Sequence, residues 1–267
     1  MQELTFPGRM ILLPGYGCDG RIFGPQRRAF GDRLETPDWL KPEAGESIAH
    51  YAQRWARLLS KPDDDRPLAL GGLSLGGVVA QEMARVIEPT PRVVLLIAST
   101  QKPDRWRLPV QAGELLGRFV PASSANKTAA LGALLYAMRD GLDDDGKTLA
   151  RAMAKDMDSA FIKWAGRAAL DWPGVKPDPT RPSPPTYHIH GQHDWVIDAA
   201  DHADEVVELG RHTLNLTHAS SVNRFLFDHF VKHVPEAQDV YPDIENPRAT
   251  AQRRLQLEGA PAGTPMV

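Results

Sequence analysis

Ser74 lies between a strand-like and a helix-like stretch, in a setting that suits a nucleophile. Leu68–Leu70 is typical of a buried strand and Val78–Val86 of a helix, and the sequence G-L-S-L-G at 72–76 connects them. A serine at a sharp strand-to-helix turn takes a strained backbone conformation that projects its hydroxyl, and flanking glycines allow close packing. The spacing predicts a nucleophile at Ser74, and a tight turn with an incidental serine is the alternative.

A serine hydroxyl is a weak nucleophile, so it needs a neighbouring base and a carboxylate that orients this base. In a doubly wound sheet such groups belong just beyond the carboxyl ends of strands. Asp194 follows the expected strand Thr186–His190, and His212 follows the expected strand Glu205–Leu209. The order along the chain is therefore nucleophile, acid, base: Ser74, Asp194, His212.

The base has a second candidate. His218 lies six residues beyond His212, and only 18 positions separate the acid from His212 (212 − 194 = 18). We favour His212 because it follows Gly210 at a strand end, and a helix missing between Asp194 and Glu205 explains the short spacing.

Other titratable residues near Asp194 allow competing assignments. Asp198 and Asp201 are alternative acids, but both are expected to be solvated. Three histidines cluster just before the acid: His188, His190 and His193. Their spacing is not a familiar metal-ligand pattern, and histidines on one face of a buried strand are more often satisfied by hydrogen bonds. We expect no metal here, and we expect Cys18 to be a small loop or core residue.

Four motifs together resemble the α/β-hydrolase fold family: G-L-S-L-G after a strand, P-G-Y-G after an earlier strand, H-G-Q-H-D after a late strand and G-R-H near the end. The resemblance covers roughly Met10–Phe230 and implies an eight-stranded, mostly parallel sheet with a Ser-Asp-His triad. It also implies that the backbone N–H groups of Tyr16 and Leu75 form the oxyanion hole. Pro14-Gly15 stands where many relatives have His-Gly.

Within that family the chain is most similar to small carboxylesterases that carry a cap. The resemblance implies a small-molecule ester as substrate, an acyl-enzyme intermediate and no cofactor. The same triad also cleaves thioesters, lactones or C–C bonds, and a member of the fold with an unused triad would only bind a ligand. The sequence leaves these alternatives open.

Apolar stretches alternate between strand and helix along the first hundred residues. The expected strands are Met10–Leu13, Leu34–Pro37, Pro67–Leu70 and Arg92–Ala98, and the expected helices are Arg21–Phe30, Ser47–Leu59 and Gly77–Ile87. This alternation predicts right-handed crossovers in an α/β, doubly wound parallel sheet. A closing helix is expected over Ser220–Phe230.

Residues 101–185 interrupt this alternation. Helical patterns fill the stretch, over Gly113–Val120, Lys127–Arg139, Asp144–Met157 and Ser159–Asp171. We expect a helical cap with a proline-rich return linker, on a core made of residues 1–100 and 186–234. Four aromatic residues of the cap are candidates for an apolar acyl pocket, although packing between helices is the commoner role: Trp106, Phe119, Tyr136 and Trp164. The polar residues 235–267 predict a flexible tail.

Composition excludes several classes of protein. The 267 residues suit one large α/β domain or two small ones, and the net charge of −3 gives no reason to expect nucleic acid as a partner. A single cysteine excludes an internal disulfide. Neither a signal pattern nor an apolar stretch of about 20 residues is present, so we expect a cytoplasmic protein without membrane insertion. The sequence gives no indication of an oligomeric state.

Overall fold

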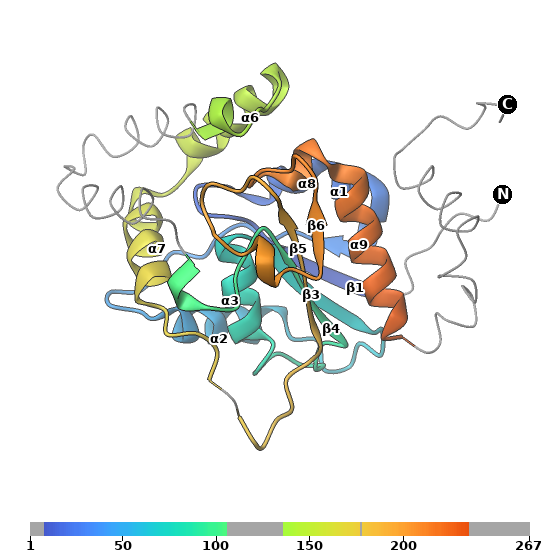
Figure 1. The fold of residues 1–267 in the computed structure, drawn as a ribbon. Coiled ribbons are helices and arrows are strands. Elements are labelled where there is room, and N and C mark those ends of the chain that lie inside the picture. Colours follow the sequence, from blue (N-terminus) through green and yellow to red (C-terminus); the bar gives the residue numbers. More distant parts are fainter. Residues whose placement is uncertain (1–7, 106–135, 177, 235–267) are drawn as a thin grey trace, which may run out of the picture.

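A computed structural model describes residues 8–105, 136–176 and 178–234. Six strands form one sheet in the order β2-β1-β3-β4-β5-β6 (Figure 1). The strands are β1 (Arg9–Leu13), β2 (Leu34–Glu35), β3 (Leu68–Leu73), β4 (Val93–Ile97), β5 (Thr186–Gly191) and β6 (Glu205–Val207). Every neighbouring pair is parallel, which confirms the predicted α/β, doubly wound fold class.

The number of strands differs from the expected eight. The six strands of the described residues come from the six segments whose apolar runs alternate with helical patterns in the sequence. The expected number of eight strands came from the family resemblance. It is not confirmed, because no other described stretch pairs with the sheet.

Helices cover both faces of the sheet because side chains along a strand point alternately to opposite sides. Ile11 and Leu13 of β1 pack into the core on one face, and Met10 and Leu12 pack into the core on the other. The first core takes its helical side chains from α2 (Ile48–Leu59), α3 (Leu75–Met83) and α7 (Ser159–Asp171). The second takes them mainly from α1 (Gly24–Phe30), α8 (Leu214–Thr217) and α9 (Ala219–Lys232).

Several helices start where the sequence provides a capping side chain. The Ser47 hydroxyl accepts a hydrogen bond from His50 N at 3.3 Å, as predicted for the start of α2. Asp143 caps α6 (Asp144–Asp156), and Asp158 caps α7 in the same way. Helix α3 begins at Leu75 and not at Gly77, because the chain turns into the helix immediately after Ser74.

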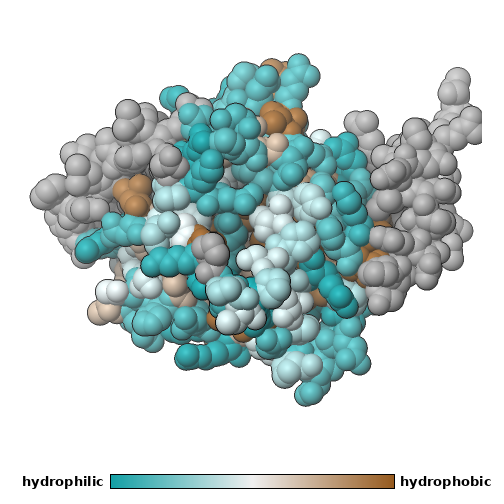
Figure 2. Space-filling view, turned by 60° about the horizontal axis from the view of Figure 1, so that its bottom comes forward, coloured by the Kyte–Doolittle hydropathy of each residue, from teal (hydrophilic) through white to brown (hydrophobic). Residues whose placement is uncertain are grey.

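Helices α6 and α7 follow β4 in the chain and precede β5, as the expected insertion requires (Figure 1). The expected helix Gly113–Val120, most of Lys127–Arg139 and the tail 235–267 lie outside the described residues. On the face drawn in Figure 2 the surface is mostly hydrophilic, with apolar side chains in small separate patches. None of the described helices has the length and apolarity needed to cross a bilayer.

Candidate active site

Ser74 occupies the turn between β3 and α3 and has a backbone conformation that side chains rarely adopt. Its φ is 52° and its ψ is −119°, as the G-x-S-x-G spacing predicts for a strained turn. Two hydrogen bonds hold the turn in place: Ser74 N donates to Ile97 O at 2.9 Å, and Ser99 Oγ donates to Ser74 O at 2.7 Å. The end of β4 therefore supports the strained residue, which is itself buried.

The glycines around Ser74 are required by close backbone contacts. A Cβ atom at Gly76 would overlap the carbonyl oxygens of Leu13 and Pro14, and one at Gly72 would overlap the backbone of Gly76. Helix α3 and the end of β1 can therefore approach each other only with glycine at these positions.

The glycine-rich loop after β1 lies directly against the candidate nucleophile Ser74. A Cβ atom at Gly15 would be 3.5 Å from Ser74 Cβ, and Tyr16 is the next residue of that loop. Leu75 is the first residue of α3, where backbone N–H groups lack intrahelical acceptors and the helix dipole is positive. Of the two residues predicted for the oxyanion hole, Leu75 directly follows Ser74, and Tyr16 belongs to the loop whose Gly15 lies against Ser74.

The candidate acid and base are brought together by tight contact between two loops. A Cβ atom at Gly191, the last residue of β5, would lie 2.5 Å from Arg211 O, and His193 N donates to Gly210 O at 2.8 Å. This contact carries Asp194 to His212, whose Nδ1 lies 2.6 Å from Asp194 Oδ2. Both side chains are buried.

Asp194 is held as a carboxylate by several donors. Its Oδ1 accepts hydrogen bonds from Val196 N at 2.8 Å and Ile197 N at 3.1 Å, while Oδ2 faces His212. Burial alone would raise the pKa of this carboxyl, but His212 and the surrounding donors hold it below its usual value. An ionised Asp194 can only accept, so His212 Nδ1 carries the proton and its Nε2 is free to accept one.

The electrostatic setting of His212 favours its cation. Burial would lower the pKa of the imidazole, but the carboxylates of Asp194 and Asp140 raise it above the usual value. A base whose cation is stabilised in this way can hold a proton taken from a hydroxyl group.

The runner-up base His218 is placed differently. It lies partly exposed at the start of α9, and its Nδ1 is 3.0 Å from the Thr217 hydroxyl. The alternative acids Asp198 and Asp201 are exposed, as expected. Between Asp194 and β6 the chain forms only a short 3-10 turn, Ala200–His202, which accounts for the short spacing between acid and base.

Asp140, a buried carboxylate from the stretch between β4 and β5, also reaches the site and is not predicted by any sequence motif. Asp140 Oδ1 accepts from His212 N at 3.1 Å and from Trp195 Nε1 at 3.2 Å. Its Oδ2 accepts from Thr213 N at 2.6 Å and from the Thr213 hydroxyl. One side chain thus holds the turn that carries the base and the residue next to the acid. No sequence signal indicated this role, because all three partners lie more than 50 residues away.

The aromatic residues predicted to bind substrate are found in two different places. The Tyr136 ring lies 6.1 Å from the His212 ring, edge-on, and 5.1 Å from the Trp195 ring. Trp164 packs 4.4 Å from Tyr51, and its indole N–H donates to Glu46 O. The other two candidates, Trp106 and Phe119, lie outside the described residues.

The histidine cluster does not form a metal site in the described part of the chain. His190 Nδ1 and His188 Nε2 are 2.9 Å apart, so the two rings bond to each other, and His193 is exposed. No group of three or more His, Cys, Asp or Glu residues in that part of the chain is arranged to hold a metal ion. Burial and the nearby Asp19 carboxylate raise the pKa of the Cys18 thiol to about 12, which suits a protonated packing residue and not a nucleophile.

Comparison with known proteins identifies the family of the chain. The model of the alpha/beta hydrolase family matches residues 10–229. The chain belongs to this family. A search of curated proteins found no significant match.

Solved structures of several hydrolases resemble this member of the family. A thermophilic esterase from Thermogutta terrifontis is 17% identical with a TM-score of 0.62, and the match covers 86% of this chain and 92% of that one. The type II thioesterase BorB from the borrelidin biosynthetic cluster is 19% identical (TM-score 0.57; 83% and 92% covered). An epoxide hydrolase from hot-environment metagenomes is 17% identical (TM-score 0.57; 84% and 90% covered). At these identities the likeness establishes the fold, and the fold supports more than one reaction.

Proposed function

We propose that this protein is a serine hydrolase that cleaves a carboxylic ester of a small molecule. The observation that carries the proposal is the 2.6 Å contact between His212 Nδ1 and Asp194 Oδ2, which leaves His212 Nε2 free as a base. A strained, glycine-flanked Ser74 follows a strand of the same sheet. In this proposal the stretch 101–185 acts as the cap over a core of residues 1–100 and 186–234.

Each residue has a defined task in the proposed reaction. Ser74 Oγ attacks the carbonyl carbon while His212 Nε2 takes the hydroxyl proton, and Asp194 stabilises the resulting imidazolium. The N–H groups of Tyr16 and Leu75 stabilise the oxyanion, and one such donor is worth about 3 kcal/mol of the barrier. His212 returns the proton to the leaving alcohol. In the second half of the reaction His212 takes a proton from water, the resulting hydroxide attacks the acyl-enzyme, and Ser74 leaves with the proton that His212 returns.

Labelling and turnover with matched variants test the proposal. Wild-type protein should be labelled by a fluorophosphonate and should hydrolyse a short p-nitrophenyl ester, and Ser74→Ala should do neither. His212→Gln should lose about six orders of magnitude in kcat, whereas the control His218→Gln should stay near wild type. Activity that persists in Ser74→Ala, or that depends on His218, would overturn the assignment.

The preferred length of the acyl chain and the type of bond that is cleaved need separate measurements. A graded series of p-nitrophenyl esters reports the preferred chain length, and matched thioesters and lactones report the preferred bond. We expect esters to give the highest kcat/KM. A thioester preferred by more than tenfold would instead assign thioesterase activity, and the similar structure of BorB is described as a type II thioesterase.

A further inference from the structure

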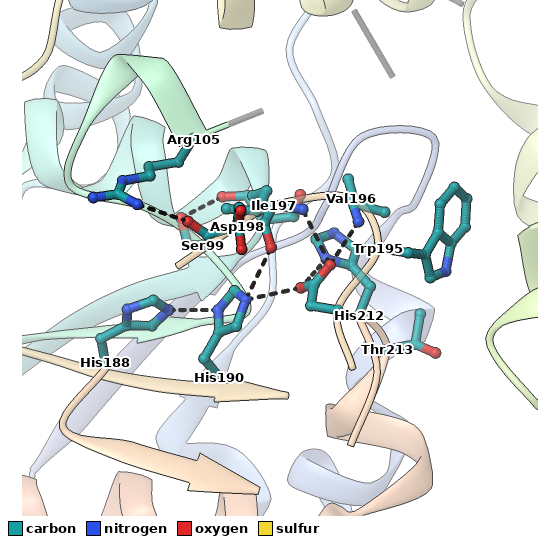
Figure 3. A network of polar contacts seen from close by, with 12 residues as sticks. Ser99, Arg105, His188, His190, Trp195, Val196, Ile197, Asp198, His212 and Thr213 are labelled. Carbon is teal, nitrogen blue, oxygen red and sulfur yellow. Dashed lines mark hydrogen bonds and ion pairs between the residues drawn. The ribbon is translucent and has the colours of Figure 1, made fainter. Parts of the chain in front are cut away.

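Two buried histidines lie behind the candidate acid, on the side away from His212. His188 and His190 share one face of β5, and both side chains are almost completely buried. Figure 3 shows them in a row that leads toward His212. His190 Nε2 lies 3.2 Å from Asp194 Oδ2, the oxygen that also holds His212, and 3.2 Å from Ile197 O.

The partners determine which ring nitrogens carry protons. Ile197 O and the ionised Asp194 can only accept, so His190 Nε2 must carry a hydrogen. In a neutral ring Nδ1 is then an acceptor, and the hydrogen of the 2.9 Å contact must come from His188 Nε2. The N–H groups of both rings therefore point in one direction, from His188 through His190 to the region of the carboxylate.

We propose that His190 is a positioning residue for the catalytic acid, and that His188 fixes its tautomer. This inference rests on the proposed function, because Asp194 and His212 take their roles from it. The Nε2–H of His190 donates to Ile197 O, and its positive end also faces Asp194 Oδ2. It therefore fixes the loop that carries the acid and withdraws part of the negative charge that His212 experiences.

Burial keeps the pair neutral, so that the donor persists over the working pH range. It lowers the pKa of His188 to about 3, and it lowers the pKa of His190 although Asp194 opposes the shift. Other charged or titratable groups surround the pair on neighbouring loops and turns: Asp194, Asp198, His202, Asp204 and His212. The pair itself thus acts as a fixed dipole and not as a pH switch.

Removal of the donor should raise the pKa of His212, because Asp194 would then present more negative charge to the imidazolium. In His190→Leu we expect this pKa to rise by about half a unit. The midpoint of the acidic limb of kcat/KM should move to higher pH by the same amount. At a pH below this midpoint, kcat/KM should therefore be approximately threefold lower than in the wild type. His190→Gln keeps an N–H donor and should restore the wild-type limb. His188→Leu should give a smaller shift in the same direction, and the exposed His193→Gln is the matched control.

An NMR titration of the histidine rings separates this inference from the proposed function, because it needs no turnover. The pKa of His212 should rise in His190→Leu and return in His190→Gln, whether or not the protein hydrolyses an ester. Ring nitrogen shifts of the wild type should show His190 neutral at pH 7 with the proton on Nε2. The opposite tautomer, protonation of His190 at pH 7, or an unchanged His212 pKa in a folded His190→Leu would overturn the inference. The tautomer measurement decides it even where the leucine variant does not fold.

Discussion

Asp140→Asn tests whether a carboxylate outside the triad holds the catalytic turn. An asparagine whose amide oxygen replaces Oδ1 can still accept from His212 N and Trp195 Nε1. Its amide N–H₂ then faces Thr213 N. In the wild type Thr213 N donates to Asp140 Oδ2 at 2.6 Å, and the variant removes this acceptor. A hydrogen bond to a charged group contributes about 1.5–3 kcal/mol, and a buried donor left without an acceptor costs a similar amount.

The expected loss of unfolding free energy is therefore about 2–3 kcal/mol. For a domain of this size such a loss lowers Tm by roughly 5–10 °C. A displaced His212 turn should also lower kcat by about tenfold with little change in KM, because the base must sit correctly in the transition state. Thermal unfolding and steady-state kinetics on a p-nitrophenyl ester measure the two effects.

The pH dependence of kcat/KM adds a second test, because the direction in which its acidic limb moves depends on the charge of Asp140. In the proposed mechanism neutral His212 is the active form, and its raised pKa places the acidic limb of kcat/KM above about pH 6.5. The Asp140 charge contributes to that rise, so Asp140→Asn should move the limb to lower pH, opposite to His190→Leu. Asp145→Asn makes the same charge change at an exposed position and should leave Tm and the limb near wild type. A wild-type Tm in Asp140→Asn, or a limb that moves upward, would refute the reasoning.

Three further predictions concern the framework of the site. Gly76→Ala should lower the free energy of unfolding by about 3 kcal/mol in urea melts, because its Cβ overlaps carbonyl oxygens at the end of β1. Gly24→Ala, where the Cβ makes only ordinary contact, should be nearly neutral. Ser47→Ala should cost about 1 kcal/mol through loss of the α2 cap, and an unchanged urea midpoint would contradict this. Iodoacetamide at pH 8 should leave Cys18 unmodified in the folded protein and label it in urea, as mass spectrometry can show. Rapid labelling of the native protein would exclude the raised pKa.

The sequence predicted much of the sheet and its helices because apolar periodicity is a local property. The continuous run at 93–97 became a strand buried on both faces, and α7 spans Ser159–Asp171 as predicted. Ser47 capped α2 because capping depends on neighbouring residues only. The strained turn at Ser74 was equally readable, since its glycines are set by contacts within one strand–turn–helix unit and the adjacent β1.

The remaining features depend on contacts between distant segments. The number of strands was inferred from family resemblance and not from periodicity, and only the pairing of segments set it at six within the described residues. Asp194 and His212 lie side by side because Gly191 packs closely against Arg211, a contact that sequence patterns do not reveal.

By itself, the sequence determined the α/β class, the strained turn at the candidate nucleophile Ser74 and the chain order of the three candidate residues. These follow from patterns of a few neighbouring residues. Only the tertiary structure decided which histidine faces Asp194, and that Asp140 and His190 approach the same centre. The physical reason is that hydrogen bonds act over about 3 Å in space and take no account of separation along the chain.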